Sequence, residues 1–110
     1  MSTISWTDFE KVDIRSGTII QVEEFLGIRN PSYKVWVDFW TDLGIKKTSA
    51  QITNYSKEEL LWKQILWVVN FPPKQIGKFM SEFLLTWVTS ENWIIIATLD
   101  THVENWKKLL

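Results

Sequence analysis

The chain contains no cysteine and only one histidine, His102, among its 110 residues. It can therefore form no disulfide and no thiolate metal site, and one imidazole cannot build a histidine metal site. A glycine-rich phosphate loop is also missing. The paired acids at 23–24 and 58–59 are adjacent, which on a strand would point their side chains to opposite faces. We therefore expect a protein that is not an enzyme and that uses no metal or other cofactor.

The chain also lacks an excess of positive charge and long apolar segments. Twelve Lys and Arg face thirteen Asp and Glu, for a net charge of −1, which excludes a broadly cationic coat for nucleic acid. No apolar run reaches the roughly 18 residues of a membrane-spanning helix. Residues 1–7 lack the basic cluster and the apolar stretch of a secretory signal. We expect a cytoplasmic protein without membrane insertion, formed as a single domain over residues 1–110.

Tryptophan, in contrast, is abundant, with eight residues that recur at no fixed interval. This spacing excludes a propeller or solenoid repeat. A domain of this length cannot hide eight indoles, so some of them should be exposed or lie at an interface.

The first half of the chain has strong strand signals. Residues 14–25 are rich in β-branched side chains, with Gly17 the expected site of a bulge or bend. Apolar and polar residues alternate from Tyr33 to Trp40, which predicts a strand with one buried face. A weaker third strand is expected over 44–52, and the apolar run within 64–71 predicts a central strand buried on both faces.

Two short helices and two further strands complete the predicted fold. Thr7 and Glu10, like Ser56 and Glu59, have the spacing of a helix capping box, which predicts helices over 7–12 and 56–62. Residues 74–80 are expected to form a connector, 81–88 a fifth strand, 89–93 a turn and 94–99 a sixth strand. A helix between the third and fourth strands favours an all-β, five-stranded OB-fold barrel with short helices and extended termini.

The segment from Asn70 to Glu82 is the best candidate for a binding site. It follows a predicted buried strand and mixes aromatic, amide, cationic and thioether groups in what should be an irregular loop, where binding residues are often found. The alternative is that Phe79 and Met80 plug the barrel and that the two prolines only end the strand.

Residues 8–19 resemble the opening of the tRNA-binding domain family, the OB-fold module appended to methionyl- and tyrosyl-tRNA synthetases. The stretches 33–39, 43–53 and 70–82 resemble the CsaA-type export-related chaperones within that family. This resemblance implies a homodimer that binds unfolded preproteins and the SecA-type translocase motor.

Five tryptophans depart from the pattern of that family, because glycine would be expected at 40, 62, 87, 93 and 106. At 40, 93 and 106 glycine would commonly supply a positive φ, and Asn92-Trp93 has lost the favoured Asn-Gly hairpin turn. Tryptophan and glycine codons can differ by one base, so an engineered, a mis-decoded or a mis-recorded chain would each explain the substitutions. These five residues are poor candidates for a binding site.

Two functions follow from these observations. A chaperone-type module would hold extended polypeptide with one set of contacts, namely Asn70, Phe71, Lys74, Gln75, Phe79, Met80 and Ser81. A tRNA binder would place lysines on phosphates, namely Lys46, Lys47, Lys74 and Lys78. The slightly acidic chain, with only two arginines, favours the first.

The unusually apolar termini predict a homodimer interface. Its candidate residues are Ile4, Trp6, Phe9, Val103, Leu109 and Leu110. The alternative is that the two termini only cap their own barrel.

Overall fold

The computed structural model of the chain describes residues 1–40 and 44–110. Its helices are α1 (Trp6–Glu10) and α2 (Lys57–Leu60). Its strands are β1 (Ile14–Glu24), β2 (Tyr33–Asp38), β3 (Ile45–Ala50), β4 (Gln64–Val68), β5 (Lys74–Ile76), β6 (Phe79–Ser81), β7 (Leu84–Leu85), β8 (Trp87–Ser90) and β9 (Trp93–Ile96). Leu43, the first residue of one stretch that carries the family resemblance, lies outside the described residues.

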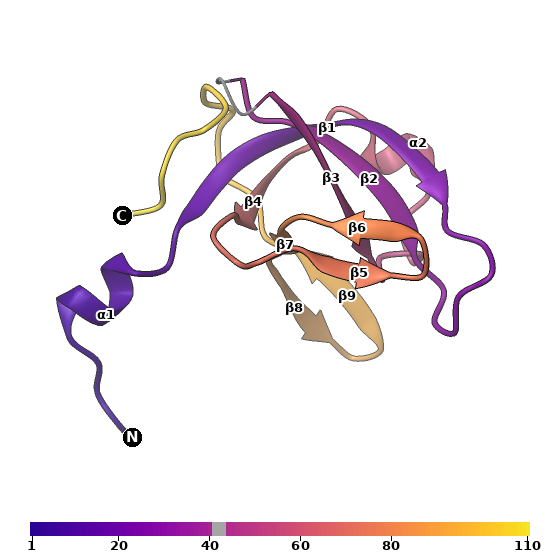
Figure 1. The fold of residues 1–110 in the computed structure, drawn as a ribbon. Helices are drawn as coiled ribbons and strands as arrows, with labels where there is room; N and C mark the ends of the chain where they lie inside the picture. The colour runs from indigo at the N-terminus through magenta and orange to yellow at the C-terminus, as the bar shows by residue number, and fades with distance from the viewer. Residues whose placement is uncertain (41–43) are drawn as a thin grey trace.

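Five strands form one antiparallel sheet in the order β3-β2-β1-β4-β7, and the sheet curls into a half-barrel (Figure 1). The hairpins β5–β6 and β8–β9 extend from it, and α2 joins β3 to β4. This arrangement confirms the expected all-β, OB-type fold. Within the described residues, no helix is long and apolar enough to cross a membrane.

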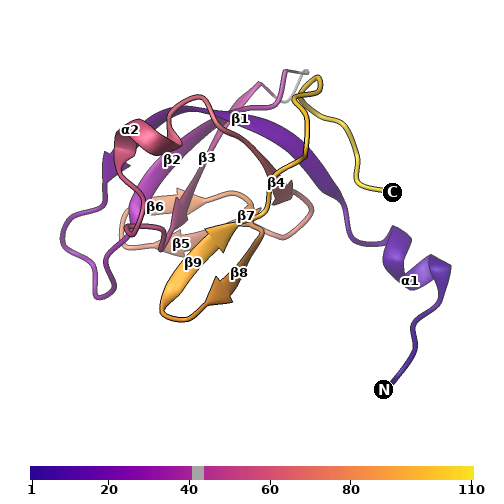
Figure 2. The ribbon, with the colours of Figure 1, turned by 180° about the vertical axis from the view of Figure 1, so that it is seen from behind.

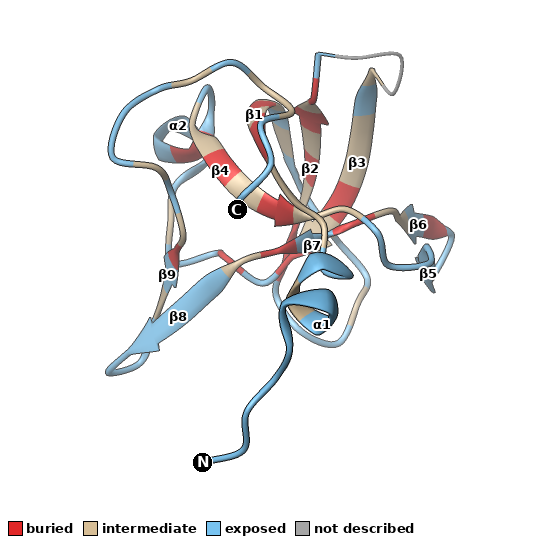
Figure 3. Cartoon of the chain, turned by 90° about the vertical axis from the view of Figure 1, so that its left-hand side faces the viewer, coloured by how far each residue is buried: buried red, intermediate tan, exposed pale blue. Residues whose placement is uncertain are grey.

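The core lies inside the curl, where alternate residues of the strands meet (Figure 3). Val35 and Val37 of β2 are fully buried, as the alternation predicts. In β4, Ile65 and Trp67 are buried, but Gln64, Leu66 and Val68 are only half-buried. The expectation that both faces of this strand are buried is therefore wrong for its outer face.

Gly17 has a different role from the one predicted. The irregularity in the pairing of β1 with β2 lies between Ile19 and Gln21. At Gly17, a β-carbon would lie 2.5 Å from Cε1 of Phe39 and 2.7 Å from Cγ1 of Val37. Glycine is needed at this position because two buried side chains pack directly against the backbone.

The two helices begin at capping boxes, one of them earlier than predicted. The Ser5 hydroxyl accepts from the Asp8 amide and the Asp8 carboxylate from the Ser5 amide, so the predicted Thr7–Glu10 pair is not the cap. For α2, the predicted pair of Ser56 and Glu59 is confirmed. The hydrogen bonds from Ser56 lower the pKa of the Glu59 carboxyl.

The second half of the chain differs most from the prediction. The expected connector over 74–80 is the hairpin β5–β6, in which Ile76 pairs with Phe79 across Gly77 and Lys78. The expected single strand over 81–88 is divided into β7 and β8 because the chain changes sheets there. The hairpin β8–β9 turns at Glu91-Asn92, one residue before the predicted Asn92-Trp93 pair, so β9 starts at Trp93.

The C-terminal tail continues the pairing of β1. The amide of Trp106 donates to the Ser16 carbonyl at 2.7 Å, and the amide of Leu109 donates to the Ile14 carbonyl at 2.8 Å. The tail therefore lies beside the first part of β1, before β2 begins to pair with that strand at Thr18. Helix α1, with no buried residue, projects away from the sheet, as Figure 2 shows from behind.

Candidate functional site

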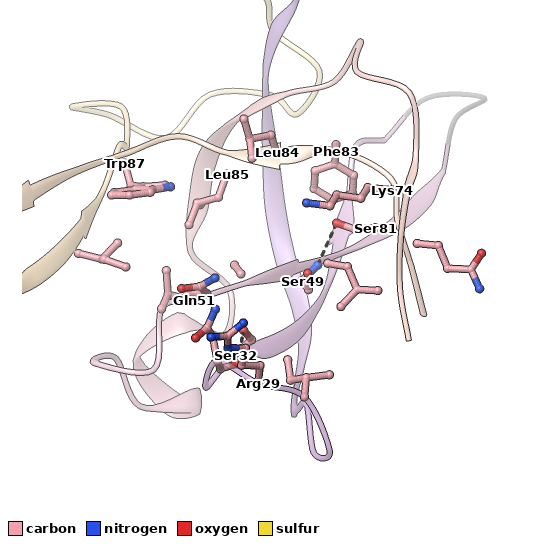
Figure 4. A pocket seen from close by; sticks show the side chains of 17 residues that line it. Arg29, Ser32, Ser49, Gln51, Lys74, Ser81, Phe83, Leu84, Leu85 and Trp87 are labelled. Atoms are coloured by element: carbon pink, nitrogen blue, oxygen red, sulfur yellow. Dashed lines mark hydrogen bonds between the residues drawn. The ribbon is translucent and has the colours of Figure 1, made fainter. Parts of the chain in front are cut away.

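A groove of about 590 Å³ lies beside the hairpin β5–β6 (Figure 4). Residues 28–30 and Ser32 of the loop between β1 and β2 border it, together with residues 49–52 at the end of β3. Lys74, Gln75 and Ile76 of β5 form another part of its wall, and Phe83 to Leu85 with Trp87 and Ile94 complete it. The groove therefore gathers segments that are far apart in the sequence.

The lining of the groove is mainly apolar, with two cationic side chains. Leu84 remains 48% exposed, whereas Leu85 beside it is buried. Arg29 and Lys74 also line the groove, and none of the described residues that line it is a carboxylate. An apolar surface flanked by cations suits an extended segment with apolar side chains and no excess of positive charge.

Hydrogen bonds at Ser81 fix the hairpin against the sheet. The hydroxyl oxygens of Thr48 and Ser81 lie 2.7 Å apart, and the Thr48 hydroxyl is also 2.6 Å from the Phe83 carbonyl. The Ser49 amide donates to the Ser81 hydroxyl at 3.3 Å. The Ser81 hydroxyl thus holds β6 against β3, which gives the groove a rigid wall.

A smaller hollow of about 280 Å³ continues the groove. It shares Lys74, Ser81, Phe83 and Leu84 with the main groove and adds Phe71 and Pro72. Phe71 is exposed, so the hollow extends the apolar surface beyond Leu84.

The structure brings only part of the predicted peptide-binding set to this surface. Lys74, Gln75 and Ser81 line the groove, and Phe71 borders the adjoining hollow. Met80 is exposed but does not line either space. Asn70 instead ties two segments together, since its side chain accepts from the Asp13 amide and donates to the Lys11 carbonyl.

Phe79 is not available to a ligand in the described structure. Its side chain is 8% exposed, and its ring packs edge-on against Phe25, with the centroids 5.3 Å apart, and against Trp36 at 6.3 Å. It therefore holds the hairpin to the outer side of β2, rather than lying in the groove or plugging the barrel.

The four predicted RNA-binding lysines do not lie on one face. Lys46 and Lys47 are adjacent in β3, and Lys46 borders a hollow of about 250 Å³ with Phe71 and Glu82. The Lys47 ammonium lies 5.6 Å from the centre of the Phe79 ring, on the outer side of the sheet. Lys74 is in β5, and Lys78 is in the turn of the same hairpin.

Several groove residues were missed because the sequence predicted only turns or a continuous strand around them. Residues 28–32 contain an Asn-Pro turn signal, but an apolar and a cationic residue, Ile28 and Arg29, stand side by side within it. An apolar residue next to a cationic one within a turn was the signal that could have indicated a binding surface there. For Leu84 and Leu85 there was none, since the division between β7 and β8 depends on tertiary pairing.

The predicted interface residues fall into two groups. Ile4 and Trp6 are exposed and Phe9 is half-buried, on or beside a helix that contacts little of its own sheet. In the tail, the backbone of Val103 forms two hydrogen bonds with the Gln64 side chain, and the Leu109 amide donates to the Ile14 carbonyl of β1. Leu110 is exposed at the end of the chain.

Solved structures with this fold identify the family. The CsaA chaperone protein from Picrophilus torridus is 42% identical, with a TM-score of 0.93, over 98% of this chain and 100% of that one. The chain belongs to the CsaA family. Chaperone CsaA from Bacillus anthracis is 36% identical, with a TM-score of 0.90, over 99% of this chain and 100% of the other.

The chain is also similar in sequence to part of a synthetase. The methionine–tRNA ligase of Parabacteroides distasonis is 29% identical over 93 residues, which are 82% of this chain and 13% of the ligase. The chain thus spans about an eighth of the length of that relative. No family model matches the chain.

Proposed function

We propose that this chain is a protein-export chaperone that binds unfolded preproteins, with an extended, partly apolar segment held in the groove beside β5. The observation that supports this most directly is the apolar surface formed by Phe71, Phe83 and Leu84, with Lys74 and Arg29 beside it. Two CsaA chaperones with closely similar folds support the same class of function. The SecA-type motor stays a predicted partner.

The working form in this proposal is a homodimer. Helix α1 buries none of its residues on its own sheet and leaves Ile4 and Trp6 exposed. Apolar side chains in that state favour association with a second copy. A sedimentation mass near the 13.1 kDa of one chain at micromolar concentration would contradict the dimer.

The groove is tested by the binding of a denatured, fluorescently labelled preprotein to Leu84→Ser. Burying the remaining exposed half of a leucine contributes about 1 kcal/mol, so the affinity should fall roughly fivefold. Binding by the unaltered chain should persist at about 0.3 M salt, because apolar burial is not screened.

Ile95→Ser is the matched control, because Ile95 is 40% exposed in β9 and does not line the groove. Its affinity should be unchanged, and thermal melting of both variants should show that the fold is retained. An equal loss of affinity in the two variants, or none in Leu84→Ser, would refute the groove as the binding site.

A tRNA-binding function is the second candidate, supported by the relationship to methionine–tRNA ligases. Lys47 and Lys78 lie on the outer side of β3 and on the hairpin next to it. If tRNA is the ligand, Lys47→Gln should weaken binding more than Leu84→Ser does, and the affinity should fall steeply with salt. Binding of tRNA that is insensitive to salt would exclude a phosphate contact by these lysines.

A further inference from the structure

Among the described non-glycine residues, a left-handed backbone conformation occurs mostly at tryptophan. Of the non-glycine residues in the described structure, four have a positive φ: Trp40 at 52°, Trp62 at 72°, Trp106 at 71° and Glu91 at 56°. This conformation brings the β-carbon too close to the following carbonyl oxygen, so bulky residues rarely adopt it. Three tryptophans among four such residues therefore require an explanation.

At two of the three positions the indole contributes little that would offset this strain. Trp40 is 66% exposed and Trp62 is 67% exposed. Their amides donate to the Asp38 side chain and to the Ile19 carbonyl, contacts that glycine would make equally well. Among the described residues, neither indole packs against an aromatic ring or a cation.

Trp106 is an intermediate case. Its amide donates to the Ser16 carbonyl, which again needs only a backbone. Its ring does have neighbours, with the Phe39 ring 5.4 Å away and the Arg15 guanidinium 4.7 Å from its centre. The backbone thus indicates glycine, and the indole occupies space beside the core.

Other tryptophans of the same chain belong to the fold. Trp67 is fully buried, its indole N–H donates to the Gly17 carbonyl at 3.0 Å, and its ring packs against Phe83. Trp36 packs against Phe79 from a regular strand. These five tryptophans therefore fall into two classes, one packed into the fold and one placed where the backbone favours glycine.

We infer that positions 40, 62 and 106 are glycine in the protein as its own cells make it. Tryptophan stands at these positions because a triplet that the cells read as glycine has been translated as tryptophan. UGA is a tryptophan codon only in some genetic codes, unlike UGG. We therefore expect UGA in the gene at the positions that are glycine in the native protein, and UGG at the true tryptophans. This inference does not rest on the proposed function.

For the tryptophan in the groove wall, the backbone gives no sign of glycine, so the inference depends there on the codon alone. Trp87 and Trp93 lie in β8 and β9 and do not have a positive φ. If they share the triplet of position 40, they are glycine as well. The indole of Trp87 would then be absent from the groove wall, and the binding surface would be wider at that end.

The gene and the native protein test this directly. The triplets at 40, 62 and 106 should be identical to one another and should differ from those at 36 and 67. Tandem mass spectrometry of the protein purified from its source cells should then find glycine at 40, 62 and 106, and tryptophan at 36 and 67. Tryptophan at 40 and 62 in that protein would overturn the inference.

Stability measurements on the chain made with tryptophan provide a second test. Trp40→Gly and Trp62→Gly should each raise the melting temperature by about 5 °C, because the left-handed strain is removed. The matched controls Trp40→Ala and Trp62→Ala remove the indole but keep the β-carbon, so they should gain clearly less. Alanine variants as stable as the glycine variants would show that the backbone does not require glycine, which also contradicts the inference.

Discussion

Gly17→Ala should destabilise the protein strongly, although alanine is the better residue in an ordinary strand. The added methyl group would lie 2.5 Å and 2.7 Å from two carbons of the Phe39 ring, and 2.7 Å from Cγ1 of Val37. Both neighbours are fully buried, so neither can move toward solvent. The β-strand next to them must shift, or the Phe39 ring must leave its position.

The expected loss follows from two opposing effects. Overpacking a tight core costs about 1 to 3 kcal/mol. Replacing glycine in a strand interior returns about 0.5 to 1 kcal/mol of backbone entropy. Because three contacts would lie at 2.7 Å or less, the overpacking cost should fall in the upper half of its range, about 2 to 3 kcal/mol. The net loss should therefore be about 1 to 2.5 kcal/mol in urea unfolding, and each kcal/mol should lower the Tm by roughly 4 to 8 °C.

A double-mutant cycle with Phe39→Leu isolates the clash. The single change Phe39→Leu removes ring contacts with Phe83 and should itself be destabilising. In that background Gly17→Ala should cost less, with a coupling above about 0.5 kcal/mol, because the ring that blocks the methyl group is gone. If Gly17→Ala is neutral in the unaltered chain, or if the two changes are additive, the close-packing explanation of Gly17 is wrong.

Two further predictions concern buried polar groups. Trp67→Phe should lower the free energy of unfolding by about 1 to 3 kcal/mol in urea, because the Gly17 carbonyl loses the indole N–H that donates to it at 3.0 Å. An unchanged midpoint would contradict a structural role for that hydrogen bond. Burial, followed by the charges of Glu24, Glu58 and Glu59, raises the pKa of the Tyr33 phenol above its ordinary value of 10.0, so its stabilising effect should be complete below pH 10 and lost as the pH rises through the raised pKa. Tyr33→Phe should show a smaller alkaline loss of stability by circular dichroism, and an equal loss would refute the assignment.

The first half of the fold could be predicted because local pattern and tertiary role agree there. The alternation from Tyr33 to Phe39 places the valines of β2 in the core, as expected from period two. The capping box at Ser56 likewise depends only on neighbouring residues. Gly17 shows the limit of such signals, since glycine in a strand indicates either a bulge or a close approach, and only the position of Phe39 decides between them.

The second half of the fold could not be predicted because tertiary contacts, and not local sequence patterns, determine its structure. The hairpin β5–β6 is short, contains lysine and glutamine, and follows two prolines, so its sequence favours a loop. It becomes a hairpin because Ser81 bonds to β3 and Phe79 packs on Trp36. The candidate groove exists only because of those contacts, and its residues are therefore dispersed through the chain.

Phe79 packs on a different side of the sheet from the apolar groove. The ammonium groups of Lys34 and Lys47 lie 5.4 Å and 5.6 Å from the centre of its ring, on the outer side of β2 and β3. Lys34 lies closer still to the Phe25 ring, at 4.9 Å. These cations thus lie where the hairpin packs on the sheet, whereas the cations among the described residues of the apolar groove are Lys74 and Arg29. An anionic ligand on the outer side would leave the apolar groove free, so binding of tRNA and binding of polypeptide need not exclude each other, and only Lys74 is common to both residue sets.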